Sequence, residues 1–183
     1  DDYKKCTRGG ADFKITIKIG AAPWSINGQS YVKKNTTDNS ARHQGADAVS
    51  AAPGDVLYWD HDLRNNGPGN MNKNVRINID RGDYAMTTAS PTEDNALKWT
   101  PRSGGSDTRG DRNELFYTSY NNSWTVQESQ LGQKLCQRVA WTPASSSSSG
   151  WGHSGFACAN IPYDYNLVPS VSLDKDTADV GTE

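Results

Sequence analysis

Apolar and polar residues alternate along several short stretches of this chain, and the most complete stretch runs from Val56 to Arg64. Turn sequences stand on both sides of it, Pro53-Gly54 before and Asn65-Asn66-Gly67-Pro68 after. The residues that share one face of the extended chain are Leu57, Trp59, His61 and Leu63, and those on the other face are Tyr58, Asp60, Asp62 and Arg64. This period of two predicts a strand with one buried face and one face in water.

The same alternation predicts further strands over residues 13–19, 75–79 and 135–141, with a short strand near Tyr31 and Val32. Residues 27–45 are otherwise polar and predict a loop, and residues 121–123 predict the turn of a hairpin between 115–120 and 124–127. Helical patterns are limited to one predicted turn over 92–98, with Thr92 as its cap. Many short strands separated by turns predict an all-β sandwich.

Composition narrows the class of protein. The 183 residues suffice for one domain with a sizeable core, and because 34% are hydrophobic, the 6 Trp and 8 Tyr must supply much of that core. The net charge of −2 carries no electrostatic signature of nucleic-acid binding, so no nucleic-acid partner is expected. The longest apolar runs are only a few residues, which predicts no membrane segment and a mature or excised piece of protein.

The chain contains three cysteines, and the position of two of them is informative. Cys136 and Cys158 lie on either side of a serine-rich loop, residues 144–150, with a strand-like run beside each cysteine. A disulfide between them would close a loop of about 22 residues and contribute roughly 3 kcal/mol. Two free, buried thiols are the alternative. A disulfide would indicate an oxidising, extracellular setting.

Several of these segments resemble a known family. Pro53-Gly54-Asp55, the strand that follows and Asn65-Asn66-Gly67-Pro68 resemble the core motif of prokaryotic conserved-repeat domains. The sequence over 59–63, together with 135–143, Cys158 and 161–167, resembles long repetitive surface proteins of ultrasmall, host-attached, Saccharibacteria-like bacteria. The resemblance implies an immunoglobulin-like antiparallel β-sandwich with long loops, located extracellularly at the cell surface, and it implies no defined activity.

The two ends of the chain contain a weak internal repeat. Cys6 is followed by the aromatic Phe13, and Cys158 by the aromatic Tyr165, with the same spacing. We therefore predict that residues 1–12 end a preceding module or contact another subunit, that 13–168 form the sandwich, and that 169–183 begin a following module or are an exchanged strand. Chance similarity is the alternative.

The ends also contain candidate contacts with neighbouring copies or modules. Cys6 has no intramolecular partner once Cys136 and Cys158 are joined, so it would be exposed or bonded to another unit. Val171 and Leu173 alternate with polar residues, and a lone strand of this kind needs a sheet edge to pair with. A repeated head-to-tail contact of this kind would generate a filament.

Two Arg-Gly-Asp tripeptides are candidate receptor loops, Arg81-Gly82-Asp83 and Arg109-Gly110-Asp111. A loop tip could present the Arg and the Asp to a receptor on a host cell. An ordinary polar turn has the same composition, and we prefer that interpretation for both.

Other candidate ligand sites are weaker. His61 is predicted to be a buried, hydrogen-bonded residue beside Trp59 that binds no metal, because adjacent strand residues point to opposite faces. The carboxylates at 174, 176 and 179 could hold calcium, although a solvated loop explains them better. Tryptophans could stack on sugar rings if they were exposed; the candidates are Trp24, Trp99, Trp124, Trp141 and Trp151. No cofactor is predicted.

Signatures of catalysis are missing from the sequence, which contains no nucleophile elbow and no phosphate loop. A self-formed Lys–Asn amide would need a strand lysine such as Lys14 or Lys18, an asparagine and a buried carboxylate. Lysines that keep a sheet edge soluble explain both residues more simply. We therefore predict a non-enzymatic structural unit of a surface fibre, pilus-like filament or adhesin; a carbohydrate- or receptor-binding module and a secreted hydrolase are the alternatives.

Overall fold

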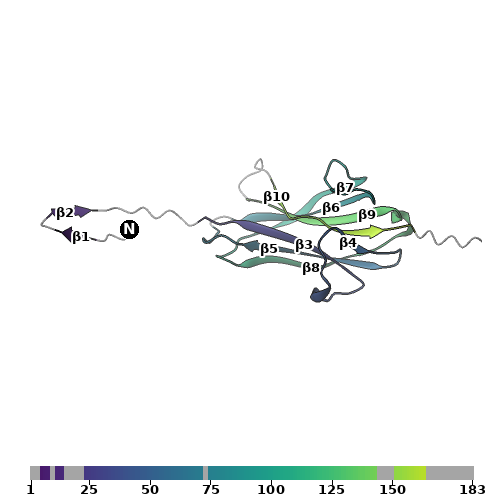
Figure 1. Ribbon diagram of the computed structural model, residues 1–183, viewed down its shortest axis with the longest axis horizontal. Coiled ribbons are helices and arrows are strands. Elements are labelled where there is room, and N and C mark those ends of the chain that lie inside the picture. The colour runs from purple at the N-terminus through teal and green to yellow at the C-terminus, as the bar shows by residue number, and fades with distance from the viewer. Residues whose placement is uncertain (1–4, 9–10, 15–22, 72–73, 144–150, 164–183) are drawn as a thin grey trace, which may run out of the picture.

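The computed structural model describes residues 5–8, 11–14, 23–71, 74–143 and 151–163, and these form an all-β structure, which confirms the predicted class. Two sheets lie one over the other (Figure 1). A separate two-stranded hairpin consists of β1 (Lys5–Arg8) and β2 (Ala11–Lys14), with Cys6 opposite Phe13. None of the helices in the described part of the chain is long and apolar enough to cross a membrane.

The smaller sheet has the order β3-β5-β8 and is antiparallel throughout. Its strands are β3 (Ile26–Lys34), β5 (Val56–Asn65) and β8 (Leu115–Thr125). β5 is the strand predicted from the alternating pattern, and the side chains of Leu57, Trp59, His61 and Leu63 are all fully buried. The pattern therefore located both the strand and its inward face.

The larger sheet has the order β4-β11-β9-β6-β7, with the short strand β10 beside β9. Its strands are β4 (Gly45–Ser50), β6 (Val75–Ala85), β7 (Lys98–Thr108), β9 (Gln133–Pro143), β10 (Gly152–His153) and β11 (Ala157–Ile161). The pair β4–β11 is parallel and the other pairs are antiparallel. Two single-turn 3₁₀ helices complete the described elements, η1 (Asn39–Ala41) and η2 (Glu128–Gln130).

The core lies between the two sheets and consists of two apolar clusters separated by polar residues. One cluster includes Trp59 and Leu135, and the other includes Leu63 and Val139. Because His61 lies between Trp59 and Leu63 on the same face of β5, its side chain enters the interior between the clusters. The interior is therefore apolar, then polar, then apolar along the strands.

The structure corrects several local predictions. Residues 121–123 do not form a hairpin turn; β8 runs through them, and Asn122 is paired with Trp59 of β5. The predicted loop over 27–45 contains most of β3, which is much longer than the expected strand near Tyr31. Residues 93–97 form turns and a bend rather than a helical turn, and the expected strand over 13–19 is described only to Lys14.

Candidate functional site

The predicted disulfide between Cys136 and Cys158 is present and fully buried, which confirms the pairing. The two cysteines are direct cross-strand partners in β9 and β11, so the bond joins neighbouring strands of one sheet. Tyr84 and Phe156 pack around it. The bond closes the segment that contains the serine-rich loop, whose residues lie outside the described part of the chain.

The first Arg-Gly-Asp tripeptide does not lie in a loop. Arg81, Gly82 and Asp83 belong to β6, which is paired on both sides by β7 and β9, and the Asp83 residue is 7% exposed. Arg81 and Asp83 point inward at one end of the sheet, as the alternation from Val75 and Ile77 requires. The expected loop presentation is therefore wrong for this tripeptide, because the flanking residues have enough strand character to continue β6 through it.

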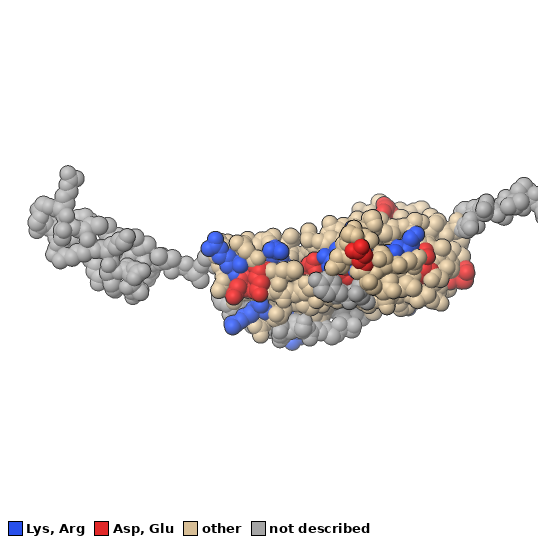
Figure 2. Space-filling model, turned by 90° about the horizontal axis from the view of Figure 1, so that it is seen from below, with Lys and Arg blue, Asp and Glu red and all other residues tan. Residues whose placement is uncertain are grey.

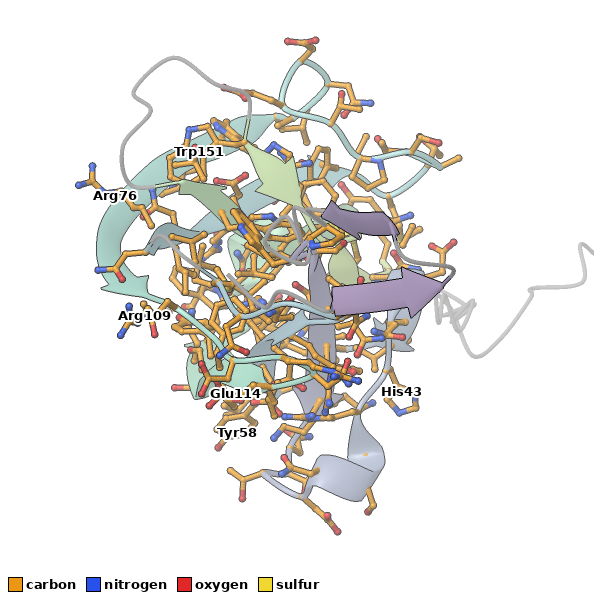
Figure 3. All side chains as sticks on the ribbon, turned by 90° about the vertical axis from the view of Figure 1, so that its left-hand side faces the viewer. His43, Tyr58, Arg76, Arg109, Glu114 and Trp151 are labelled. Carbon is orange, nitrogen blue, oxygen red and sulfur yellow. A yellow bond between two sulfur atoms is a disulfide. The ribbon has the colours of Figure 1, made fainter. Side chains whose placement is uncertain are left out.

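The second tripeptide does lie in a connection, between β7 and β8. Arg109 is exposed at the rim of the molecule (Figure 3), whereas Gly110 is buried against Phe116. The Asp111 backbone N–H donates a hydrogen bond to Oε2 of Glu114. The exposed charged residues of this connection are Arg109, Asp111, Arg112 and Glu114, so the tripeptide presents its Arg and its Asp among other surface charges.

The inward-facing Arg81 and Asp83 line a groove of about 320 Å³. Its other lining residues are Leu97, Lys98, Trp124, Gln127, Ser129, Gln130 and Gln133. Leu97 is 65% exposed and forms an apolar part of the rim. The groove thus combines one carboxylate, two cations, several neutral hydrogen-bonding side chains and one aromatic ring.

Contacts within the groove limit what it can bind. The Arg81 guanidinium lies 3.6 Å from the centre of the Trp124 ring, and its Nη2 is 3.4 Å from Oδ1 of Asp83. The Trp124 Nε1–H donates to Oε1 of Gln130 at 3.1 Å. Since Arg81 covers one face of the indole, a sugar ring could not stack on that face unless Arg81 moved.

The tryptophans are not exposed in the described part of the chain. Trp59 is fully buried, and those that are partly buried are Trp24, Trp99, Trp124, Trp141 and Trp151. A carbohydrate-binding surface would offer two or more exposed aromatic rings in one concave patch, whereas the groove contains one ring, that of Trp124. This difference favours a structural role for the aromatic residues.

His61 is buried as predicted and takes part in a polar network inside the core. Its Nδ1 is 2.9 Å from Oγ of Ser30, and its Nε2 is 3.4 Å from Oε1 of Gln137. Ser30 in turn contacts Oγ of Ser154 at 2.7 Å and accepts a hydrogen bond from the Val139 backbone N–H. Burial lowers the pKa of His61 to about 4, so the imidazole is neutral at physiological pH.

A second polar cluster lies on the outer face of the smaller sheet, under the connection that contains η1. Nζ of Lys33 is 2.9 Å from Oδ2 of Asp60, and both side chains are fully buried. Arg42, from the covering connection, binds the same Asp60 oxygen at 2.9 Å and Asp62 at 3.1 Å. The cluster holds the connection against the sheet and accounts for the burial of Asp60, which the alternating pattern placed in water.

Surface charge shows no single dominant sign on the face drawn in Figure 2, where basic and acidic groups are interspersed. Within the described residues, no three His, Cys, Asp or Glu side chains are grouped as metal ligands would be. Of the predicted contacts at the ends, Cys6 lies in β1, while Val171 and Leu173 lie outside the described residues, as do the carboxylates at 174, 176 and 179.

Neither polar cluster could be found from the sequence, because each joins residues that are distant along the chain. Lys33 and Asp60 are typical strand-surface residues until the connection at Arg42 covers them. Comparisons with protein-family models, with curated proteins and with solved structures found no match to this chain.

Proposed function

We propose that this chain is a non-enzymatic structural building block of an extracellular surface fibre, pilus-like filament or adhesin. The observation that carries the proposal is where the described chain enters and leaves the two-sheet body. It enters before β3 at one end of the long axis and leaves after β11 at the opposite end (Figure 1). A module of this kind can be repeated in a line without its connections having to turn back.

The strand order supports an immunoglobulin-like interpretation of the fold. In such sandwiches the first, second and fifth strands share one sheet, and the third, sixth and seventh share the other. Here β3, β5 and β8 correspond to the first group, and β6, β9 and β11 to the second. β4 follows β3 but crosses to the larger sheet, where it runs parallel to β11. The position of the disulfide departs from antibody domains, in which the bond joins the two sheets.

The buried disulfide supports an extracellular location, because such bonds persist in oxidising compartments. The resemblance to bacterial surface repeats points to the same location. Hydrogen bonds and ion pairs within the chain hold both polar clusters, which suits a module that has to stay folded outside the cell. Antibodies raised against the folded module should label intact source cells, and labelling only after lysis would contradict a surface location.

Assembly through the ends is tested by sedimentation of the purified chain under non-reducing conditions over a wide range of concentration. We expect oligomers larger than dimers. The single variant Cys6→Ser and the double variant Val171→Asp/Leu173→Asp report on disulfide and strand contacts, and at least one should shift the distribution to monomer. Leu115→Asp, at an exposed position on β8, is the matched control and should not. A chain that remains monomeric at every concentration would contradict head-to-tail assembly.

A carbohydrate- or receptor-binding module is the second candidate, and the groove beside Arg81 is the observation that favours it. Its amide side chains could hydrogen-bond a polar ligand, with specificity set by Arg81 and Asp83. A glycan array probed with the labelled protein tests this function. Gln127→Ala should weaken any binding about tenfold, the loss expected for one or two hydrogen bonds. Gln29→Ala, at a residue that lines a different hollow, should have no effect, and equal loss in both variants would exclude the groove.

A further inference from the structure

Three side chains on neighbouring strands of the larger sheet converge on one oxygen atom. Nζ of Lys134 donates a hydrogen bond to Oδ1 of Asp47 at 2.8 Å, and Nδ2 of Asn160 donates to the same oxygen at 2.9 Å. Lys134 lies on β9, Asn160 on β11 and Asp47 on β4. Lys134 and Asn160 are also direct cross-strand partners, so their backbones are held beside each other.

The surroundings differ for the three groups. The Lys134 side chain is 2% exposed, and its Nζ also donates to the Thr88 backbone carbonyl at 2.8 Å. The Asn160 carbonyl oxygen, Oδ1, is buried and has no hydrogen-bond partner among the residues that the structure describes. The Asp47 side chain is 70% exposed, unlike the buried carboxylate expected for a self-formed amide, but its Oδ1 lies against the largely buried Lys134 side chain. A primary amine is therefore held beside a carboxamide, with one carboxylate oxygen in contact with both nitrogens.

We propose that Lys134 and Asn160 form an intramolecular amide crosslink, with Asp47 transferring protons between them. Asp47 accepts a proton from the Lys134 ammonium, and the free amine attacks Cγ of Asn160. The Nζ–Cγ bond forms, the Cγ–Nδ2 bond breaks, and the protons passed through Asp47 leave with Nδ2. The products are one secondary amide and one ammonium ion, the Asp47 carboxylate is regenerated, and no oxidant or cofactor is consumed.

The position of Asp47 suits this transfer. Hydrogen bonds from Lys134 and Asn160 lower the pKa of its carboxyl group, which makes the carboxylate a weak base, so the transfer depends on its direct contact with both nitrogens. Its exposure gives the ammonium ion a direct path to solvent. The same oxygen contacts the nitrogen that must lose a proton and the nitrogen that must gain one, so no rearrangement of the carboxylate is needed.

A similar group on the smaller sheet lacks this arrangement and serves as a comparison. Nζ of Lys33 contacts Asp60 at 2.9 Å and the Asn39 amide oxygen at 3.4 Å. Asp60 is bound by the Arg42 guanidinium as well, so a second cation occupies the carboxylate oxygen that Lys33 contacts. The expected product therefore forms at Lys134 and not at Lys33.

The crosslink would join β9 to β11 at the pair Lys134–Asn160, two residues along both strands from the cross-strand pair Cys136–Cys158. Unlike the disulfide, an amide resists reduction. The two bonds together would keep β11 attached to the sheet in either redox state. This inference does not depend on assembly into a fibre, and its test uses the isolated chain.

Intact mass spectrometry of the reduced, denatured protein tests the proposal. The expected mass is that of the sequence less one ammonia, and peptide mapping should recover residues 134 and 160 in one branched peptide. Lys134→Arg keeps the positive charge beside Asp47 but cannot form this amide, so it should restore the full mass in a protein that still folds. Asp47→Asn should slow the loss of ammonia by at least tenfold, the lower range for general acid–base catalysis. Asn39→Ala is the matched control and should leave the mass deficit intact.

Two outcomes would overturn the proposal. One is a wild-type protein of full mass after prolonged incubation at neutral pH, which would make the three residues an ordinary ion pair and hydrogen bond. The other is a deficit that maps to Asn27-Gly28 or Asn66-Gly67, where ring closure onto the backbone also releases ammonia. Retention of the deficit in Lys134→Arg would indicate this second outcome.

Discussion

His61 is the residue through which pH should act on the stability of the folded module. Burial lowers its pKa from the ordinary value of 6.5 to about 4, so the unfolded chain binds a proton over a range in which the folded chain does not. The free energy of unfolding should therefore fall as pH is lowered from about 6.5 to about 4, by roughly 3 kcal/mol in total. Urea unfolding at a series of pH values measures this slope.

The variant His61→Gln should lose this dependence of the free energy of unfolding on pH. Its amide group can still contact Ser30 and Gln137. His43→Gln is the matched control, because the His43 side chain is exposed in the connection before β4. An unchanged slope in His61→Gln would show that other groups cause the acid sensitivity.

Asp60 shows how strongly a buried charge depends on its partners. It faces Lys33 and Arg42 with no exposure to water. Asp60→Ala should lower the free energy of unfolding by roughly 3–5 kcal/mol, because it leaves the Lys33 ammonium buried without that carboxylate. Denaturant titration measures the loss.

Two further variants separate charge from packing at this position. Asp62→Ala removes a partly exposed carboxylate bound to the same Arg42 and should cost about 1 kcal/mol or less. The double variant Lys33→Met/Asp60→Leu, which removes both buried charges, should recover much of the stability lost in Asp60→Ala. If Asp60→Ala is as stable as the wild type, the Lys33–Asp60 pair contributes nothing to the free energy of unfolding.

At the scale of elements, β3 is fitted closely to β9 at Gly28. A Cβ atom at this position would lie 2.3 Å from Cζ3 of Trp141, on the opposite sheet. Gly28→Ala should therefore destabilise the protein by about 1–3 kcal/mol through overpacking, measured as a lower thermal midpoint. Gly155→Ala, where an added Cβ would meet no atom of the described residues within 4 Å, should change stability by less than about 0.5 kcal/mol. Equal effects would mean that the two sheets separate easily at this point.

Strands with strong alternation could be predicted from sequence, and strands with small or polar residues could not. β5 and β9 carry large apolar residues at most of their inward positions, so the burial of these strands follows directly from the pattern. β4 was missed because its inward positions carry Ala46 and Ala48, which give little contrast with their neighbours. β8 was divided in two because Asn-Asn-Ser has turn composition, although pairing with β5 holds it extended.

The candidate sites were less predictable than the strands, for a physical reason. The disulfide could be predicted because its two cysteines stand out in a chain with only three. The cluster of Asp47, Lys134 and Asn160 could not, because such residues are common on surfaces and only the sheet order β4-β11-β9 brings them together. Tertiary pairing, rather than local composition, creates these groups.

At the scale of the whole molecule, the opposite positions of the two described ends determine how force would act on a linear array. Tension would enter at β3 and leave at β11, along the long axis (Figure 1). β4 and β11 run parallel and share several backbone contacts. A pull along β11 therefore loads these contacts together, in shear, rather than one after another. Resistance to force is governed by the unfolding rate, which is slow when many contacts must break together.

Single-molecule stretching of a tandem array of this module tests both the direction of load and the disulfide. The 22-residue separation of Cys136 and Cys158 should shorten the released chain by ~75 Å relative to the Cys136→Ser/Cys158→Ser variant, at about 3.4 Å per residue. The comparison is made in a Lys134→Arg background, so that the proposed amide cannot hold the same segment closed. Equal released lengths in the two arrays would mean that the Cys136–Cys158 bond does not carry the load. Adding a reducing agent to the disulfide-containing array should abolish the difference in released length.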